Sequence, residues 1–208
     1  MKDIVIFGTG NFAEIATEYF NNVSDMQVIA YTRTTSPFGV INGIDIYNFN
    51  NIEEYCSPDR YYMFVAVGYG SDFNSSYREE IVTEAVKKGY TCICYKSPDA
   101  FVWSNVDWVR ANNFIFENNI IQPFVIVGKG NVIWSGNHIG HHSVIGNYNF
   151  ISSHCVISGN CKIGDNNFIG VNSTIIDGIK IGNKCIIGAG SLVLKDVPDN
   201  TKVIGIWK

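Results

Sequence analysis

The sequence has few charged residues, no excess of basic side chains and no long apolar run. Of its 208 residues 16% are charged, and the formal net charge is −4. Lysine and arginine form no dense basic stripe, so nucleic acid is not an expected partner. No apolar stretch approaches the length that spans a membrane, and Ile4–Phe7 is too short for a signal peptide. We therefore expect a cytoplasmic protein without membrane insertion.

The six cysteines lack the spacing of a metal site or a redox motif. Cys92 and Cys94 are separated by a single residue, and no second pair completes a zinc site. Cys155, Cys161 and Cys185 instead recur in phase with a six-residue repeat. We interpret the cysteines as structural.

That repeat is the dominant feature of the chain: an aliphatic residue stands at every sixth position from residue 109 to residue 193. A helical period of 3.6 cannot keep every sixth residue on one side, whereas a strand period of two can. The pattern predicts short strands and turns coiled into a β-solenoid of about five coils, with no extruded loop. The in-phase residues are Val109, Ile115, Ile121, Val127, Ile133, Ile139, Ile145, Ile151, Ile157, Ile163, Ile169, Ile175, Ile181, Ile187 and Val193.

Two other positions of the repeat support a solenoid. The residue after the aliphatic one is often glycine, which favours a tight corner with unusual backbone angles: Gly128, Gly140, Gly146, Gly164, Gly170, Gly182 and Gly188. Because residues i and i−2 of a strand share a face, the small residues two positions before the aliphatic one should also point inward. These are Asn131, Asn137, Ser143, Asn149, Cys155, Cys161, Asn167, Ser173, Cys185 and Ser191.

Part of this repeat resembles the C-terminal signature of hexapeptide-repeat acyltransferases. It reads Ile-Gly-Asp-Asn-Asn-Phe-Ile-Gly-Val-Asn-Ser-Thr-Ile over residues 163–175 and Ile-Gly-Ala-Gly-Ser-Leu-Val-Leu-Lys-Asp-Val-Pro over residues 187–198. The resemblance implies a left-handed parallel β-helix with three strands per coil. It also implies a homotrimer in which each acceptor site is shared between two chains.

Residues 1 to about 96 alternate strand and helix, which is typical of a parallel sheet with helices on its faces. We expect two domains: a Rossmann-like α/β domain with a small parallel sheet over residues 1–96, and the β-helix over residues 97–208. The expected strands are Ile4–Phe7, Gln27–Tyr31, Tyr62–Val67 and Thr91–Tyr95, with a hairpin at Val40–Tyr47. Helices are expected from Asn11, at Asn51–Tyr55 and from about Ser75 to Lys88.

Ligands on such sheets bind beyond the carboxyl ends of the strands. A glycine turn that opens a helix can present backbone N–H groups to a phosphate. No Asp or Glu follows the second strand to hold a ribose, so a nicotinamide cofactor is not expected. The edge is lined by Gly8, Gly10 and Asn11, then Thr32 and Arg33, then Gly68 and Tyr69.

The whole chain resembles the branch of hexapeptide-repeat enzymes that contains bacterial sialic-acid O-acetyltransferases and the N-acetyltransferases of nucleotide-linked amino sugars. In that branch the N-terminal domain binds the sugar nucleotide, acetyl-CoA is the acyl donor, and the product serves surface polysaccharide or glycan biosynthesis. The resemblance implies donor contacts along the outside of the coils, at Gly146, Gly164, Gly170, Val171, Gly188, Ala189 and Lys195.

All four histidines lie between residues 138 and 154, and by phase none points inward. Gly140-His141-His142-Ser143-Val144-Ile145-Gly146 resembles the branch's motif His-Asp/Glu-x-Val-Ile-Gly. The resemblance makes His141 the catalytic base and places His142 where the branch has a carboxylate that orients it. His138 and His154 would contact substrate. Converging histidines could also bind zinc, but their spacing does not resemble the ligand pattern of β-helical carbonic anhydrases, and we assign no metal.

We predict an acetyl-CoA-dependent N-acetyltransferase that acts on a nucleotide-linked deoxyamino sugar. His141 would remove a proton as the amine attacks the thioester, and a backbone N–H at Gly146 or Gly164 would stabilise the oxyanion. Two alternatives remain open. One is O-acetylation of a free sugar such as sialic acid, and the other is a solenoid scaffold without catalytic activity.

Overall fold

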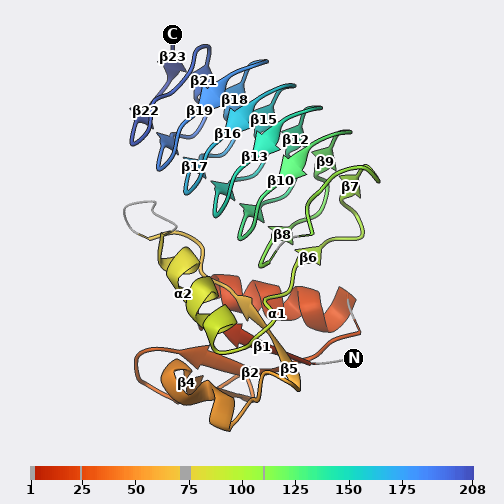
Figure 1. Cartoon of the computed structure of the whole chain (residues 1–208), viewed down its shortest axis with the longest axis vertical. Helices are drawn as coiled ribbons and strands as arrows, with labels where there is room; N and C mark the ends of the chain where they lie inside the picture. The colour runs from red at the N-terminus through yellow and green to blue at the C-terminus, as the bar shows by residue number, and fades with distance from the viewer. Residues whose placement is uncertain (1–2, 24, 71–75, 110) are drawn as a thin grey trace. The chain divides into compact units, whose positions relative to one another are not determined.

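The computed structural model describes residues 3–23, 25–70, 76–109 and 111–208. The chain divides into two compact units, both drawn in Figure 1. The first is formed by Met1–Gly68 and Arg78–Ile93, and the second by Tyr69–Tyr77 and Cys94–Lys208. Among the described residues, neither unit contains a helix long and apolar enough to cross a membrane.

The first unit is a five-stranded sheet in the order β3-β4-β2-β1-β5. Strands β1 (Asp3–Phe7), β2 (Val28–Arg33), β4 (Ile44–Asn48) and β5 (Tyr61–Val65) run parallel, as predicted. Strand β3 (Gly39–Ile41) is antiparallel to β4, which confirms the hairpin. The helices are α1 (Asn11–Val23), the 3₁₀ helix η1 (Phe49–Glu54) and α2 (Ser76–Lys87).

The strand predicted at Thr91–Tyr95 is wrong. Around Cys92 the chain makes only an isolated bridge to Met63 of β5. It then leaves the sheet, because the Tyr95 N–H donates to Asn113 O and the next residues begin the solenoid.

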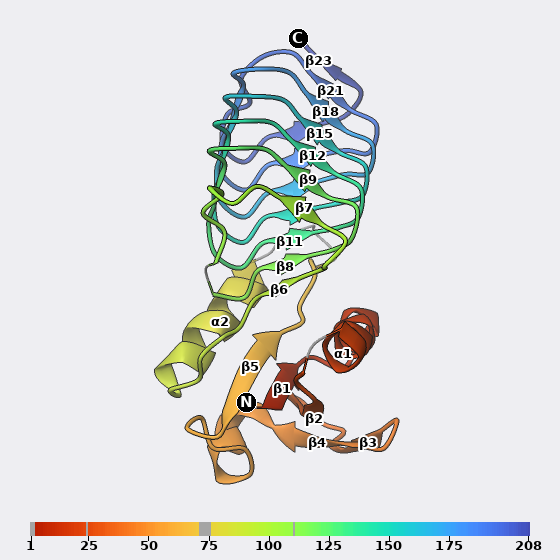
Figure 2. The same cartoon turned by 90° about the vertical axis from the view of Figure 1, so that its right-hand side faces the viewer.

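The second unit is a left-handed parallel β-helix, and Figure 2 shows its coils stacked along one axis. Three stacks of two-residue strands form its faces. Stack A contains β6 (Tyr95–Lys96), β8 (Phe114–Ile115), β11 (Val132–Ile133), β14 (Phe150–Ile151), β17 (Phe168–Ile169), β20 (Ile186–Ile187) and β22 (Lys202–Val203). Stack B contains β7 (Phe101–Val102), β9 (Ile120–Ile121), β12 (His138–Ile139), β15 (Val156–Ile157), β18 (Thr174–Ile175), β21 (Leu192–Val193) and β23 (Ile206–Trp207). Stack C contains β10 (Ile126–Val127), β13 (Val144–Ile145), β16 (Lys162–Ile163) and β19 (Lys180–Ile181).

From Phe114 to Val193 the register between coils is constant, so the predicted absence of an extruded loop is confirmed there. Ile133 pairs with Ile151, Ile151 with Ile169 and Ile169 with Ile187. The in-phase residues from Ile115 to Val193 are buried. Val109, predicted to begin the series, is instead 74% exposed. The first coil is one residue out of register with the later ones, since Asp107 pairs with Ile126, and Trp108 therefore packs against the core in place of Val109.

The small inward residues hold successive coils together through their side chains. The Oδ1 atom of Asn131 accepts the N–H of Asn149 at 2.9 Å, and Asn149 and Asn167 repeat the contact with Asn167 and Cys185 at 2.9 and 2.7 Å. Ser143 Oγ plays the same part on another stack, accepting from Cys161 N. We refer to the Asn131–Asn149–Asn167 series as the asparagine ladder. It satisfies backbone N–H groups that the dry interior would otherwise leave without a partner.

The inward cysteines are confirmed as part of this interior. Cys155, Cys161 and Cys185 are buried free thiols. Burial raises the pKa of the Cys155 thiol to about 11, so this side chain stays protonated and behaves as a small apolar residue near neutral pH.

The prediction that the glycines after the aliphatic residue have unusual backbone angles is wrong. The left-handed residues stand two positions later: Asn112, Asn118, Phe124, Gly130, Gly136, His142, Tyr148, His154, Asn160, Asn166, Asn172, Gly178, Lys184 and Gly190. The glycines are needed for close approach between coils. A Cβ on Gly146 would lie 2.6 Å from Gly164 O, and one on Gly164 would lie 2.6 Å from Gly182 O.

The asparagine ladder predicts a specific stability loss. Asn149→Ala should lower the free energy of unfolding by roughly 1–3 kcal/mol, because the buried Asn167 N–H loses its acceptor. Asn149→Ser should recover part of the loss, since Ser143 already accepts the equivalent bond. Equilibrium urea unfolding measures both. An alanine variant as stable as the wild type would contradict the role assigned to the ladder.

Candidate functional site

The solenoid has three edges, which are the lines of turns between its faces. The first edge follows stack A (116–118, 134–136, 152–154, 170–172 and 188–190). The second follows stack B (122–124, 140–142, 158–160 and 176–178, continuing at 194–195), and the third follows stack C (128–130, 146–148, 164–166 and 182–184). Every candidate residue of the β-helix can be placed by its edge or face.

His141 and His142 lie side by side on the second edge, and both are exposed. Their Nδ1 atoms are 3.1 Å apart, which is hydrogen-bond distance when one of the two carries the proton. The backbone N–H of His141 donates to Gln122 Oε1 at 2.9 Å. The ring of His142 lies 4.7 Å from that of Phe124. Both imidazoles are thus held by neighbours while remaining accessible.

The other two histidines lie elsewhere on the same side of the solenoid. His138 is half-buried on the outer face of β12, between Ile120 and Val156. His154 is on the first edge, where its ring lies over Gly136. The prediction that no histidine points inward is confirmed. Within the ranges that the structure describes, no three His, Cys, Asp or Glu side chains gather into a group that could hold a metal ion.

A groove opens along the first edge because its corner residues become smaller from coil to coil. Phe116 stacks on Trp134, with ring centroids 4.3 Å apart, but the next corners carry Ser152, Gly170 and Gly188. The space left is a groove of about 490 Å³, lined by Tyr69, Ser152, Phe168, Gly170, Val171, Ile186, Gly188, Ala189, Lys202 and Ile204. The structure therefore brings together four of the predicted donor contacts: Gly170, Val171, Gly188 and Ala189.

The groove is mainly apolar, with polar groups at defined points. Lys202 is its charged residue. The Val171 and Ala189 N–H groups make no hydrogen bond to another described residue. Tyr69 forms part of the wall, its ring 4.6 Å from Phe150 and 4.8 Å from Phe168. Sequence reasoning missed Lys202 because it follows the last in-phase residue.

The remaining predicted donor contacts lie on other edges. Gly146 and Gly164 are on the third edge, where their N–H groups donate to Ile163 O and Ile181 O at 2.8 Å. Neither N–H is therefore free to stabilise an oxyanion, contrary to the sequence-based expectation. Lys195 is on the second edge, with its ammonium 5.2 Å from the centre of the Trp207 ring.

In the first unit the ends of β1 and β2 meet at one edge of the sheet, as predicted. The Gly8 N–H donates to Thr32 O at 2.8 Å, and Arg33 Nη1 donates to Thr9 Oγ1 at 3.3 Å. A Cβ on Gly8 would lie 2.9 Å from Ala66 O, so only glycine fits there. The Thr32 hydroxyl is buried and donates to Tyr47 O.

The other residues predicted at this edge of the sheet, in the first unit, have different surroundings. Gly10 O accepts the Ala13 N–H at the start of α1, and Asn11 is the exposed first residue of that helix. Gly68 O accepts from the buried Arg78 at the end of the first unit. Tyr69 belongs to the second unit, in the groove wall.

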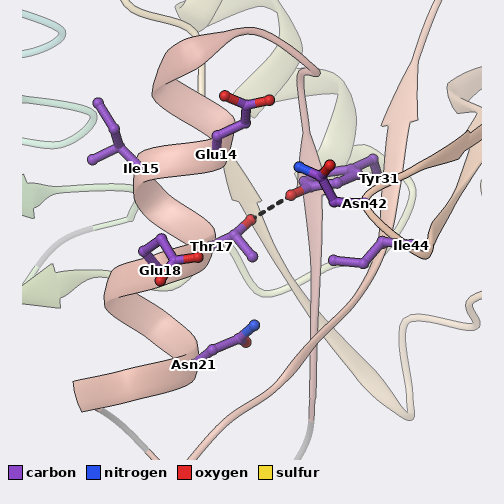
Figure 3. Close-up of a pocket in the computed structure, with 8 residues that line it drawn as sticks. All are labelled: Glu14, Ile15, Thr17, Glu18, Asn21, Tyr31, Asn42 and Ile44. Carbon is purple, nitrogen blue, oxygen red and sulfur yellow. Dashed lines mark hydrogen bonds between the residues drawn. The ribbon is translucent and has the colours of Figure 1, made fainter.

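A second cavity in the first unit was not predicted. It has a volume of about 410 Å³ and lies between α1, β2 and the β3–β4 hairpin, lined by Glu14, Ile15, Thr17, Glu18, Asn21, Tyr31, Asn42 and Ile44 (Figure 3). At its floor the Thr17 and Tyr31 hydroxyls are 2.8 Å apart and hydrogen bonded. Its polar groups come from a helix face and a hairpin turn, which carry no sequence motif.

Comparison with known proteins bears on both units. Residues 160–195 match the Hexapep family, described as bacterial transferase hexapeptide (six repeats). This confirms the resemblance seen over residues 163–198. No curated protein sequence matches the chain closely enough to count as a relative.

Several solved structures match the chain over nearly all of its length. PerB from Caulobacter crescentus, in complex with CoA and GDP-perosamine, is 21% identical over 99% of this chain and 95% of its own, with a TM-score of 0.87. The acetyltransferase domain of PglB from Neisseria gonorrhoeae is 20% identical over 99% and 97%, with a TM-score of 0.85. WeeI from Acinetobacter baumannii is 21% identical over 99% and 97%, with a TM-score of 0.84. The chain therefore carries the hexapeptide repeat of bacterial transferases and has the two-unit fold of these acetyltransferase structures.

Proposed function

We propose that this protein transfers an acetyl group from acetyl-CoA to the amino group of a nucleotide-linked deoxyamino sugar. The observation that carries the proposal is the exposed imidazole of His141. Its Nδ1 atom is 3.1 Å from His142 Nδ1, which leaves Nε2 to act on a substrate. The fold shared with an enzyme solved with CoA and GDP-perosamine supports the choice of donor and acceptor.

The sugar nucleotide would bind at the sheet edge of the first unit. The turn from Gly8 to Asn11 opens α1, and the N–H groups at a helix N-terminus are a common binding site for phosphate. The Gly8 N–H itself donates to Thr32 O. The Arg33 guanidinium, placed beside Thr9, adds a positive charge. Together they suit a diphosphate, and we infer that the nucleotide part is held here.

The acyl donor would bind in the groove of the first edge. Its apolar walls suit a pantetheine arm. The N–H groups of Val171 and Ala189 would bind amide or carbonyl oxygens, and Lys202 would pair with a phosphate. Acetyl-CoA, when bound, supplies the acetyl thioester.

His141 would act as the general base. For Nε2 to accept a proton, His141 must carry its own proton on Nδ1 and donate it to His142 Nδ1. His142 then fixes the tautomer and orientation of the base, a task for which the branch uses a carboxylate. As the amine nitrogen bonds to the acetyl carbon, His141 takes the amine's proton. The C–S bond then breaks, and the protonated imidazole gives this proton to the departing thiolate, so that CoA leaves as the thiol.

The positions of base and groove support a site that is shared between chains. His141 is on the second edge and the groove is on the first, with stack B between them. The outer face of stack B also exposes Phe101, Ile120 and Ile206, which are 58%, 45% and 65% exposed. Such a bare apolar face is typical of a subunit interface. We therefore propose a homotrimer in which His141 of one chain serves the groove of its neighbour.

A thermal-shift panel tests the proposed class of ligands. Acetyl-CoA and one of the UDP-, dTDP- or GDP-linked amino sugars should each raise the unfolding midpoint, because both bind the folded state. A rise with free sialic acid and with no nucleotide would favour O-acetylation instead. No shift with any of them would favour a scaffold without catalytic activity.

The roles of the histidines predict different kinetic defects. His141→Ala should lower kcat roughly 10²- to 10⁴-fold and leave the KM for acetyl-CoA nearly unchanged, because the base is lost and the groove is not. His142→Ala should cost less, since it removes only the orienting partner. His138→Ala and His154→Ala should mainly raise KM. Steady-state kinetics distinguishes these patterns, and wild-type turnover by His141→Ala would end the assignment of the base.

A shared site predicts complementation between two inactive variants. Val171→Trp should block the groove and leave His141 intact, whereas His141→Ala removes the base and leaves the groove open. After co-refolding an equal mixture, about a quarter of the sites should combine two intact halves by random assortment. Recovered activity on that scale, with a trimer mass by light scattering, is expected. No recovery in mixed trimers would mean that each chain builds its own site.

A further inference from the structure

Gly159 is the exception at its position on the second edge. Four other coils carry side chains at the equivalent turn position: Pro123, His141, Asp177 and Lys195. Gly159 has no left-handed backbone angle, since in this turn that conformation belongs to Asn160. Neither the coil nor its own backbone therefore requires a glycine at this position.

The space beside Gly159 is filled by the imidazole of His141. A Cβ on Gly159 would lie 2.8 Å from His141 Cε1 and 2.9 Å from His141 Nε2. Gly136 is similar, because a Cβ there would lie 2.7 Å from His154 Cε1, but its left-handed backbone angle accounts for that glycine. Glycines such as Gly140 and Gly170 instead face the backbone of the next coil. A Cβ on Gly140, for example, would lie 2.5 Å from Gly159 N. At Gly159 the close contact is with the imidazole of His141, so a side chain there would displace this ring and not the backbone.

The next coil closes the other side of this space. Asp177 Oδ1 accepts the Gly159 N–H at 3.0 Å and lies 3.2 Å from the same Cβ position. The imidazole is thus fixed at two points: Nδ1 faces His142, and the Nε2 edge rests over the turn that Asp177 anchors.

We propose that Gly159 is a positioning residue for His141, and that its missing side chain lets the imidazole lie across the adjacent turn in the orientation the reaction needs. This rests on the proposed role of His141 as base. If Gly159 positions the ring, the direction of His141 Nε2 depends on the neighbouring coil as well as on His142. A methyl group at position 159 would turn the ring away without removing it.

The test is Gly159→Ala, alone and combined with His141→Ala. Turnover is measured as release of the CoA thiol from acetyl-CoA with UDP-, dTDP- and GDP-linked amino sugars. The single variant should lose roughly 10- to 10²-fold in kcat, because a displacement of about 1 Å in a catalytic group has that effect. Its KM for acetyl-CoA should not change. Pro123→Ala, at the same turn position two coils earlier, is the control and should keep wild-type turnover.

The double variant decides between positioning and a general structural effect. If Gly159 acts only through the imidazole, His141→Ala with Gly159→Ala should be no slower than His141→Ala alone. A further loss in the double variant, or normal kcat in Gly159→Ala, would overturn the proposal.

An NMR measurement separates this proposal from the proposed function. If His141→Ala keeps full turnover, the assignment of the base fails. The contact between Gly159 and the His141 ring is then tested by the His141 Hε1 resonance. That resonance should shift in Gly159→Ala and stay in place in Pro123→Ala. An unchanged resonance in Gly159→Ala would show that the glycine does not hold the ring.

Discussion

The solenoid depends on a hydrogen bond that runs from a buried side chain to the backbone N–H of the next coil. Asparagine supplies it at Asn131, Asn149 and Asn167, and serine supplies it at Ser143. The aliphatic residues provide most of the burial, but apolar contact is non-directional and does not by itself fix which residues pair. The side-chain bonds are directional, and they fix the register of one coil on the next.

Constant register has a functional result, because it turns spacing in the sequence into position on a surface. Residues in equivalent turns form a straight line along an edge. The groove follows from one such line, in which Phe116 and Trp134 give way to Ser152, Gly170 and Gly188. The environment of His141 follows from another, in which the glycine at position 159 is flanked by His141 and Asp177.

The sequence was sufficient to predict these lines but not the details within them. The sixfold aliphatic pattern predicted the coils, the absence of inserted loops and the outward direction of the histidines, because each follows from strand periodicity alone. It did not reveal that Val109 is exposed, because the first coil pairs one residue out of register, through Asp107 and Ile126. It also placed the unusual backbone angles on the glycines, although residues such as His142 adopt them. Propensity does not distinguish a glycine needed for its angle from one needed for close approach.

The sixfold aliphatic pattern did not predict contacts between segments that are distant in the sequence. Tyr69 follows a strand of the sheet, and nothing local indicates that its ring lies against Phe150 and Phe168 of the solenoid. Lys202 lies beyond the last repeat and reaches the groove because the pairing of β20 with β22 continues the stack. The N–H groups of Gly146 and Gly164 are not available as donors for a related reason, because they are bonded to backbone carbonyls of the next coil.

Because the register is constant, a whole coil can be inserted or deleted without disturbing its neighbours. Adjacent coils are separated by about 4.8 Å, the spacing of paired strands. Insertion or deletion of one eighteen-residue coil would preserve every inward contact type and every edge, yet it would move all later residues by that one step. A chain of this design can therefore alter the distance between its base and its donor groove in fixed increments, without the repacking that a globular core would require.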